Sequence, residues 1–196
     1  SEAGEFVDVT GDTMTGDLTI SGADLVMSNG EIIAATGAET TPSITFDGDT
    51  NTGLYSPGAD QVAVTTGGTG RLFVDGSGNV GIGATSPAAT LDLNGNYTSN
   101  VTAVSALNID CSAGNYFTKT INANSTFTFS NVPSSRAYSF TLELTHTSGT
   151  VTWPTSVEFP DDTAPTLTTG KTHLFMFITD DGGTRFRGAA LVDYDN

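Results

Sequence analysis

Residues 62–82 read VAVTTGGTGRLFVDGSGNVGI, and this stretch sets the pattern for much of the chain. It holds three alternating apolar pairs, Val62-x-Val64, Leu72-x-Val74 and Val80-x-Ile82. Between the pairs stand Gly67-Gly68 and Asp75-Gly76, which are typical of tight turns because Gly and Asp tolerate the backbone conformations that turns need. The stretch therefore predicts short strands joined by turns.

The same rhythm continues outward on both sides of this stretch. Ile44-x-Phe46 precedes it and Leu91-x-Leu93 follows it, at a spacing of about ten residues that suits a meander or an interlocked β-prism. Thr is the commonest residue, Gly contributes 23 residues, and no continuous run of good helix formers is present. The chain is expected to be all-β.

A third series of short alternations occupies residues 11–35. The pairs are Leu18-x-Ile20 and Leu25-x-Met27, followed by Ile32 or Ile33, with Gly or Asn-Gly between them. Strands of three residues cannot stabilise one another as an isolated sheet. We therefore expect several identical chains to wind together, each burying a thin apolar stripe against the others, as a homotrimer or another homo-oligomer.

The second half is denser and predicts an antiparallel β-sandwich-like domain. Six strands are expected, at 116–121, 126–129, 138–145, 150–153, 173–179 and 185–192. Residues 174–178 are apolar on both faces, so this strand is either central or meets another chain through its second face. Residues 97–107 fit a short helix or a further strand and mark a boundary. The predicted organisation is 1–40 (attachment and shaft), 41–98 (shaft) and 99–196 (head).

Charge and composition exclude several classes of partner. The net charge is −16, so phosphate backbones and anionic membranes would repel the chain. We expect no nucleic-acid partner. No apolar run reaches the roughly 18 residues that would span a bilayer, and the first residues lack the pattern of a signal peptide, so no membrane insertion is expected. Cys111 is the only cysteine, which excludes an internal disulfide.

Three segments resemble bacteriophage fibre proteins. Residues 11–16, Gly-Asp-Thr-Met-Thr-Gly, resemble the Gly-x-Thr-Met-Thr-Gly repeat of fibre shafts. Residues 52–55, 71–75, 78–83 and 91–93 resemble the region that often precedes the self-cleaving chaperone domain of fibres and tailspikes. Residues 150–154, 164–167 and 180–183 resemble a C-terminal β domain of phage appendages. No catalytic Ser and Lys region of that chaperone follows Leu93, so self-cleavage is not implied.

The resemblance implies a homotrimeric virion protein, a tail fibre that attaches the particle to a host surface. Its partners would be other virion proteins, at the baseplate, an adaptor or the capsid, together with a host polysaccharide or protein. A capsid decoration protein or head fibre is the alternative within structural proteins. A polysaccharide-degrading enzyme of the tailspike type and a stand-alone carbohydrate-binding module are the alternatives from other classes.

Chemical motifs are sparse, and we expect neither a catalytic site nor a cofactor. Most acidic residues stand beside Gly in turns, which is ordinary turn composition. Asp47, Asp49 and Asn51 have the opening spacing of a calcium loop, but the loop's later Gly and Glu are replaced by Thr52 and Gly58. The prediction is therefore a solvated turn, with these three residues as the one metal candidate.

Receptor contact requires exposed aromatic and polar side chains rather than a motif. Tyr138, Trp153 and Phe159 would stack on a sugar face, while Asp180, Asp181 and Arg185 would supply hydrogen bonds. Trp153 has an alternative role as a core residue, because large aromatic residues anchor small sandwiches. The two histidines, His146 at an expected hairpin and His173 at an expected strand start, are predicted to lie at the surface or in a subunit contact.

Overall fold

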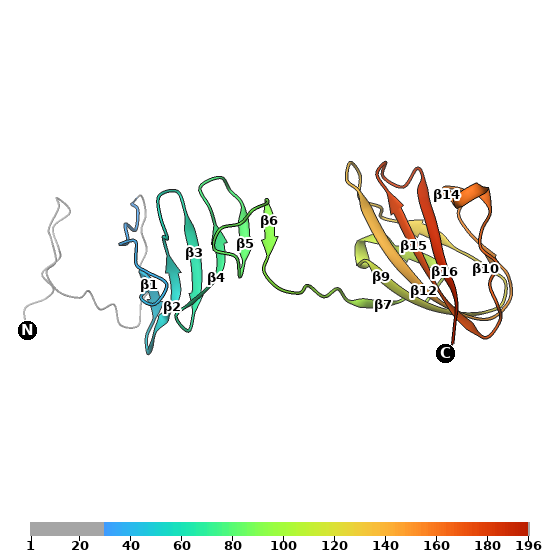
Figure 1. The fold of residues 1–196 in the computed structure, drawn as a ribbon, viewed down its shortest axis with the longest axis horizontal. Coiled ribbons are helices and arrows are strands. Elements are labelled where there is room, and N and C mark those ends of the chain that lie inside the picture. The colour runs from blue at the N-terminus through green and yellow to red at the C-terminus, as the bar shows by residue number, and fades with distance from the viewer. Residues whose placement is uncertain (1–29, 196) are drawn as a thin grey trace, which may run out of the picture. The chain divides into compact units, whose positions relative to one another are not determined.

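The computed structural model describes residues 30–195 and divides the chain into two compact units, Ser1–Gly95 and Asn96–Asn196. Within the described residues every regular element is a strand or a short 3-10 turn, which confirms the all-β prediction (Figure 1). Each unit is described by itself.

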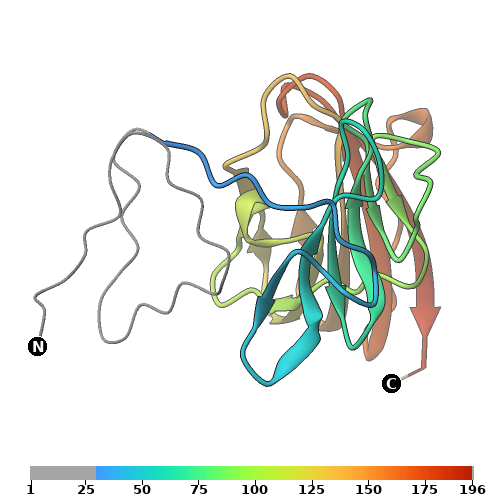
Figure 2. The same cartoon turned by 90° about the vertical axis from the view of Figure 1, so that its left-hand side faces the viewer.

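Unit 1 contains a single six-stranded sheet whose strands follow one another in chain order. The strands are β1 (Ile44–Phe46), β2 (Asp49–Tyr55), β3 (Val62–Thr66), β4 (Thr69–Val74), β5 (Val80–Ile82) and β6 (Leu91–Leu93). All neighbours are antiparallel except β5 and β6, which are parallel. Five of the six strands coincide with predicted apolar pairs. The sixth, β2, was not predicted, and it forms a hairpin with β1 (blue and cyan in Figure 2).

One face of this sheet is covered by the chain's own connections. Tyr55, Ala63 and Phe73 are buried there. The preceding segment is tied to this face through Glu39: its carbonyl accepts a 2.8 Å hydrogen bond from the Thr65 hydroxyl, and its carboxylate accepts one from the Gly70 amide. Burial, and secondarily the charge of Glu39, raises the pKa of Tyr55.

The connection from β5 to β6 also runs close to the sheet, and Gly81 makes this possible. A Cβ at this position would come closer to the Ala84 carbonyl oxygen than the 3.0 Å that real Cβ atoms keep. The parallel pairing of β5 and β6 requires such a crossing connection, since a tight hairpin can only reverse the chain.

The predicted strand at Ile32 or Ile33 is not formed. Both residues are described, lie outside any strand and are 69% and 89% exposed. Among the described residues of a single chain this segment has no strand beside it to pair with, which is the physical reason. The predicted pairs Leu18-x-Ile20 and Leu25-x-Met27 lie outside the described residues.

Unit 2 is built on a second six-stranded sheet, with the order β14-β16-β15-β12-β9-β7. Its strands are β7 (Val101–Ala103), β9 (Tyr116–Asn122), β12 (Tyr138–Ser148), β14 (Val157–Glu158), β15 (Lys171–Thr179) and β16 (Phe186–Tyr194). Two small sheets are formed by β8 (Asn108–Asp110) with β11 (Thr128–Ser130), and by β10 (Ser125–Thr126) with β13 (Val151–Thr152). Two 3-10 turns, η1 (Cys111–Ala113) and η2 (Pro160–Asp162), complete the unit.

The core of unit 2 lies between the main sheet and the short strands. Alternate residues of β12 and β15 point inward, among them Phe140, Leu142 and Phe175, and they meet Ile109 and Phe127 from the other side. Aromatic rings dominate this core; for example, Phe117 and Phe140 are 5.6 Å apart between ring centroids, edge to face. Such pairs add about 0.5–1.5 kcal/mol each beyond the buried area.

The strand directions differ from the predicted antiparallel sandwich. In the main sheet only the neighbours β12–β15 and β15–β16 are antiparallel; β9 is parallel to β12, β7 to β9, and β14 to β16. The reason is the path between β9 and β12, which crosses through β10 and β11 and returns in the same direction. The single strand predicted at 126–129 is therefore two strands with different partners, divided at the fully buried Phe127.

Candidate self-association surface and the predicted binding residues

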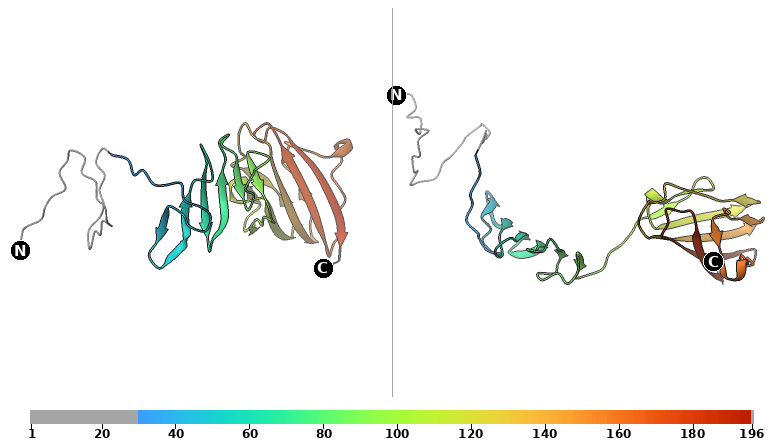
Figure 3. Two further views of the ribbon diagram at one scale, coloured as in Figure 1. Left: turned by 60° about the vertical axis from the view of Figure 1, so that its left-hand side comes forward. Right: turned by 90° about the horizontal axis from the view of Figure 1, so that it is seen from above.

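The uncovered face of the unit 1 sheet carries two continuous rows of apolar side chains. Cross-strand register places the first row on all six strands: Ile44, Leu54, Val64, Leu72, Ile82 and Leu93. The second row, two residues away on the four strands β3 to β6, runs through Val62, Val74, Val80 and Leu91. We call these ten residues the apolar face. Figure 3 shows β1–β6 as one layer.

The apolar face is solvent-exposed in the single chain and contains no charged residue. Leu91 is 59% exposed, Ile44 51% and Ile82 48%, whereas Ala63 and Phe73 on the opposite face are 0% and 5% exposed. Exposed large apolar residues are common singly, but an uninterrupted patch across six strands indicates an interaction site.

The face is large enough to make a substantial contribution to assembly. Six strands spaced about 4.8 Å apart give a width of about 29 Å, and two rows of side chains span about 12 Å along the strands, so the face covers roughly 350 Å² in projection. Six of the ten side chains are 40–59% exposed and the other four are partly buried, so covering them contributes roughly 8 kcal/mol per chain. This contribution lies near the middle of the range of about 4–15 kcal/mol that association costs, and three chains sharing one core would each contribute it.

The calcium-loop candidates lie along the β1–β2 hairpin. Asp47 is in the turn, while Asp49 and Asn51 are exposed on the extended β2, and the Asp49 carbonyl accepts a 2.8 Å hydrogen bond from the Thr45 hydroxyl. Because β2 is extended, the three residues follow one another along the hairpin rather than around a common centre. Within residues 30–195 no group of three His, Cys, Asp or Glu side chains is arranged to hold a metal ion.

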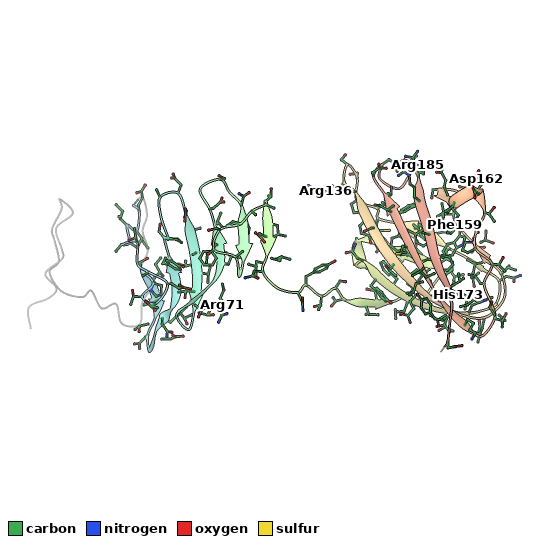
Figure 4. All side chains as sticks on the ribbon, in the orientation of Figure 1. Arg71, Arg136, Phe159, Asp162, His173 and Arg185 are labelled. Carbon is green, nitrogen blue, oxygen red and sulfur yellow. The ribbon has the colours of Figure 1, made fainter. Side chains whose placement is uncertain are left out.

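The three aromatic receptor candidates are engaged in the packing of unit 2. The ring of Trp153 lies 4.5 Å from Phe175 and 5.3 Å from Phe127 between centroids, the second pair being stacked. Phe159 is 8% exposed (Figure 4). The Tyr138 hydroxyl donates to the Gly114 carbonyl, and burial raises the pKa of Tyr138. Trp153 is partly buried and lines two surface pockets, but its ring contacts with Phe127 and Phe175 favour the core role that the sequence left open for this residue.

The polar candidates gather at the hairpin between β15 and β16. One Asp181 carboxylate oxygen accepts hydrogen bonds from the Arg185 amide and the Thr179 hydroxyl, each at 3.0 Å, and the amide contact is the main cause of the lowered pKa of Asp181. The Arg185 side chain lies 4.0 Å from both Asp180 and Glu158. Tyr138, the first residue of β12, pairs with Thr179, the last residue of β15, so Tyr138 lies beside this hairpin.

The prediction that both histidines lie at the surface or in a subunit contact is wrong for this chain. His146 and His173 are 5% and 0% exposed, with ring centroids 6.0 Å apart. His146 belongs to the long strand β12 rather than to a turn, and its Nε2 is 2.8 Å from the Gly149 carbonyl oxygen. His173 Nδ1 accepts a hydrogen bond from the Asp193 amide at 3.2 Å, and its Nε2 is 3.3 Å from the Thr168 carbonyl. Backbone partners at both ring nitrogens compensate the burial of His173, whereas His146 has a backbone partner only at Nε2 and its buried Nδ1 has none among the described residues.

Comparisons with protein-family models, with curated proteins and with solved structures give no match. No helix within residues 30–195 is long and apolar enough to cross a membrane.

Proposed function

We propose that this chain is a structural protein of a bacteriophage virion, a homotrimeric fibre in which unit 1 assembles the shaft and unit 2 is the head that contacts the host surface. The apolar face of unit 1 is the observation that carries the proposal. It is bare in one chain, uncharged and continuous, and a second and third copy of the same sheet are the surfaces that fit it. The resemblance of residues 11–16, 52–93 and 150–183 to phage fibre sequences supports the same assignment.

The sheet order explains why such a unit suits a fibre. Each strand of β1–β6 pairs with the next in the chain, so the sheet lengthens strand by strand without closing or returning. The connections before β1 and between β5 and β6 cover one face only, with Glu39 and Gly81 at the points of closest approach. The other face must be covered from outside the chain, and the same requirement recurs along the whole length of the sheet.

Attachment by three heads requires no enzymatic step. Three weak contacts on one particle raise the overall affinity through effective concentration, provided that the heads reach their sites together. A rigid, long-lived shaft and several identical heads are the two physical requirements, and the proposed trimer meets both.

Light scattering on the purified chain tests the assembly. A mass of about 60 kDa, three times the 20.1 kDa of one chain, is the expected result. A compact monomer across micromolar concentrations would contradict the proposal. The attachment role is tested separately by competition: added trimer should slow adsorption of phage that carries this protein. A trimer that leaves adsorption unchanged would retain the structural role and remove the attachment role.

A further inference from the structure

The head carries a second, smaller apolar surface on the outer side of its main sheet. Side chains of β15 and β16 that point away from the core lie next to one another in register: Leu174 beside Leu191, and Met176 beside Ala189. Ile178 and Tyr194 extend this pair of rows at its two ends. We call these six residues the outer strip. Met176, Ile178 and Leu191 are 45%, 48% and 51% exposed.

The outer strip is narrow, and the neighbouring strand marks its limit. On β12, the outward residues are Ser139, Thr141, Glu143 and Thr145, all of them polar. The change from apolar to polar therefore falls between two adjacent strands of one sheet face. Such a division is typical of a sheet face that is covered by another surface over part of its width and exposed to solvent over the remainder.

The strip is also hollowed at one end. A groove of about 670 Å³ lies over Met176 and Ile178, with Tyr97 and Ser99 along one wall and Tyr116 beside them. The ring of Tyr97 is 80% exposed. A side chain from a neighbouring molecule can therefore insert into this groove as well as lie against the strip.

Strand β16 borders the strip with an open edge. Its outer neighbour β14 pairs only with Phe186 and Arg187, and among the described strands none continues beside residues 188–194. A strand edge with apolar side chains is a ready template for contact with another chain unless it is covered.

We infer that the outer strip is a second contact between copies of this chain, formed only after the apolar face of unit 1 has brought the copies together. This inference rests on the proposed homotrimer. Charge favours a second copy as the occupant. Two chains of net charge −16 repel each other, but the six strip residues are uncharged, and Arg187, which pairs with Ile178 at one end of the strip and lines the groove, is basic and does not add to that repulsion.

The area of the strip explains why it would act second. Two strands about 4.8 Å apart and a length of about 20 Å give roughly 200 Å² per copy. This is little more than half of the area of the apolar face and about a quarter of the roughly 800 Å² that each partner buries in a stable interface, so the strip alone is not expected to hold free heads together at micromolar concentration. Tethering by an assembled unit 1 raises the local concentration of heads to about the millimolar range, where a small contact can form.

The thioether of Met176 provides a direct test, because its oxidation by hydrogen peroxide can be followed by peptide mass spectrometry in the full-length chain. In the assembled protein we expect Met176 to oxidise at least about ten times more slowly than in the full-length variant Leu54→Asp, which is designed to be monomeric through a change confined to unit 1. Ile178→Glu should keep the mass of three chains and restore fast oxidation of Met176.

The outcomes separate this inference from the proposed function. Equal oxidation rates in a protein that has the mass of three chains would overturn the second contact and leave the fibre assignment intact. A monomeric wild-type chain would overturn both. Protection of Met176 that depends on added host polysaccharide would overturn the self-contact in favour of a carbohydrate site.

Discussion

Replacing Leu54 by Asp tests whether the apolar face is the core of the assembly. Leu54 lies in the middle of the first row, between Ile44 on β1 and Val64 on β3, and is 41% exposed in the single chain. A carboxylate is tolerated there when the face is in water. In a three-sheet assembly the same change places three carboxylates in a shared apolar interior.

The expected loss is large compared with the energy of a subunit contact. Each copy loses roughly 1 kcal/mol of leucine burial, half of the value for a fully buried side chain. Each also buries an unpaired charge, at a cost of several kcal/mol even after relaxation. Summed over three copies the penalty is about 10 kcal/mol or more, and each 1.4 kcal/mol is a factor of ten in the association constant. The variant should therefore be monomeric at micromolar concentration.

Light scattering and thermal unfolding measure the result, and Asn51→Asp is the matched control. Asn51 is on the same strand, is exposed, points to the opposite face and gains the same charge with almost no change in shape. We expect the control to keep the mass of three chains and the heat resistance of the wild type. If Leu54→Asp also keeps both, the apolar face is not buried in the assembly and the reasoning fails.

Three further predictions concern the individual units. Trp153→Ala should lower the stability of unit 2 by about 3 kcal/mol, because its ring fills the space between Phe127 and Phe175, and calorimetry should show a drop of at least about 12 °C in the melting temperature of that unit. Gly81→Ala should destabilise unit 1, because the added Cβ clashes with the Ala84 carbonyl. Gly76→Ala should not, because an added Cβ meets only ordinary contacts there. The melting transitions of the two variants, each measured and then compared, would show this difference. Asp181 has a folded-state pKa below its usual value of 3.8, so its contribution to stability is present above about pH 4 and lost as the pH falls through the folded pKa. Stability measured over a pH series should therefore fall less steeply in acid for Asp181→Asn than for the wild type. An unchanged acid dependence would contradict the role of this carboxylate.

Strand positions were predictable wherever apolar residues alternate, and the exception is instructive. Strand β2 begins Asp49-Thr50-Asn51-Thr52, a polar run that reads as a turn or an ion-binding loop. It is a strand because it pairs with β1 and β3 on either side, and this tertiary context overrides the local composition. The opposite error concerns His146. The polar residues that follow it predicted a hairpin, but His146 lies within the strand β12 and is buried.

The sequence predicted that an apolar surface would remain uncovered, but not which residues form it. The sequence predicted thin apolar stripes that a single chain cannot bury. Which residues share a face depends on the register between strands, and one residue of slip would exchange Leu72 with Phe73. The bulge between Val64 and Thr65 sets this register, and the covering segment at Glu39 decides which face is buried. Neither feature follows from the alternation of residues alone.

The distribution of charge connects the two surfaces with the assembly. A chain of net charge −16 repels its own copies. Association then requires contacts that are free of charge, and the apolar face and the outer strip meet this condition. The apolar face offers the larger apolar area of the two, so in the proposed fibre assembly should proceed in a fixed order, from unit 1 to the head. In the proposed fibre, a head that closes only on an assembled shaft would present its receptor surface in three copies or not at all.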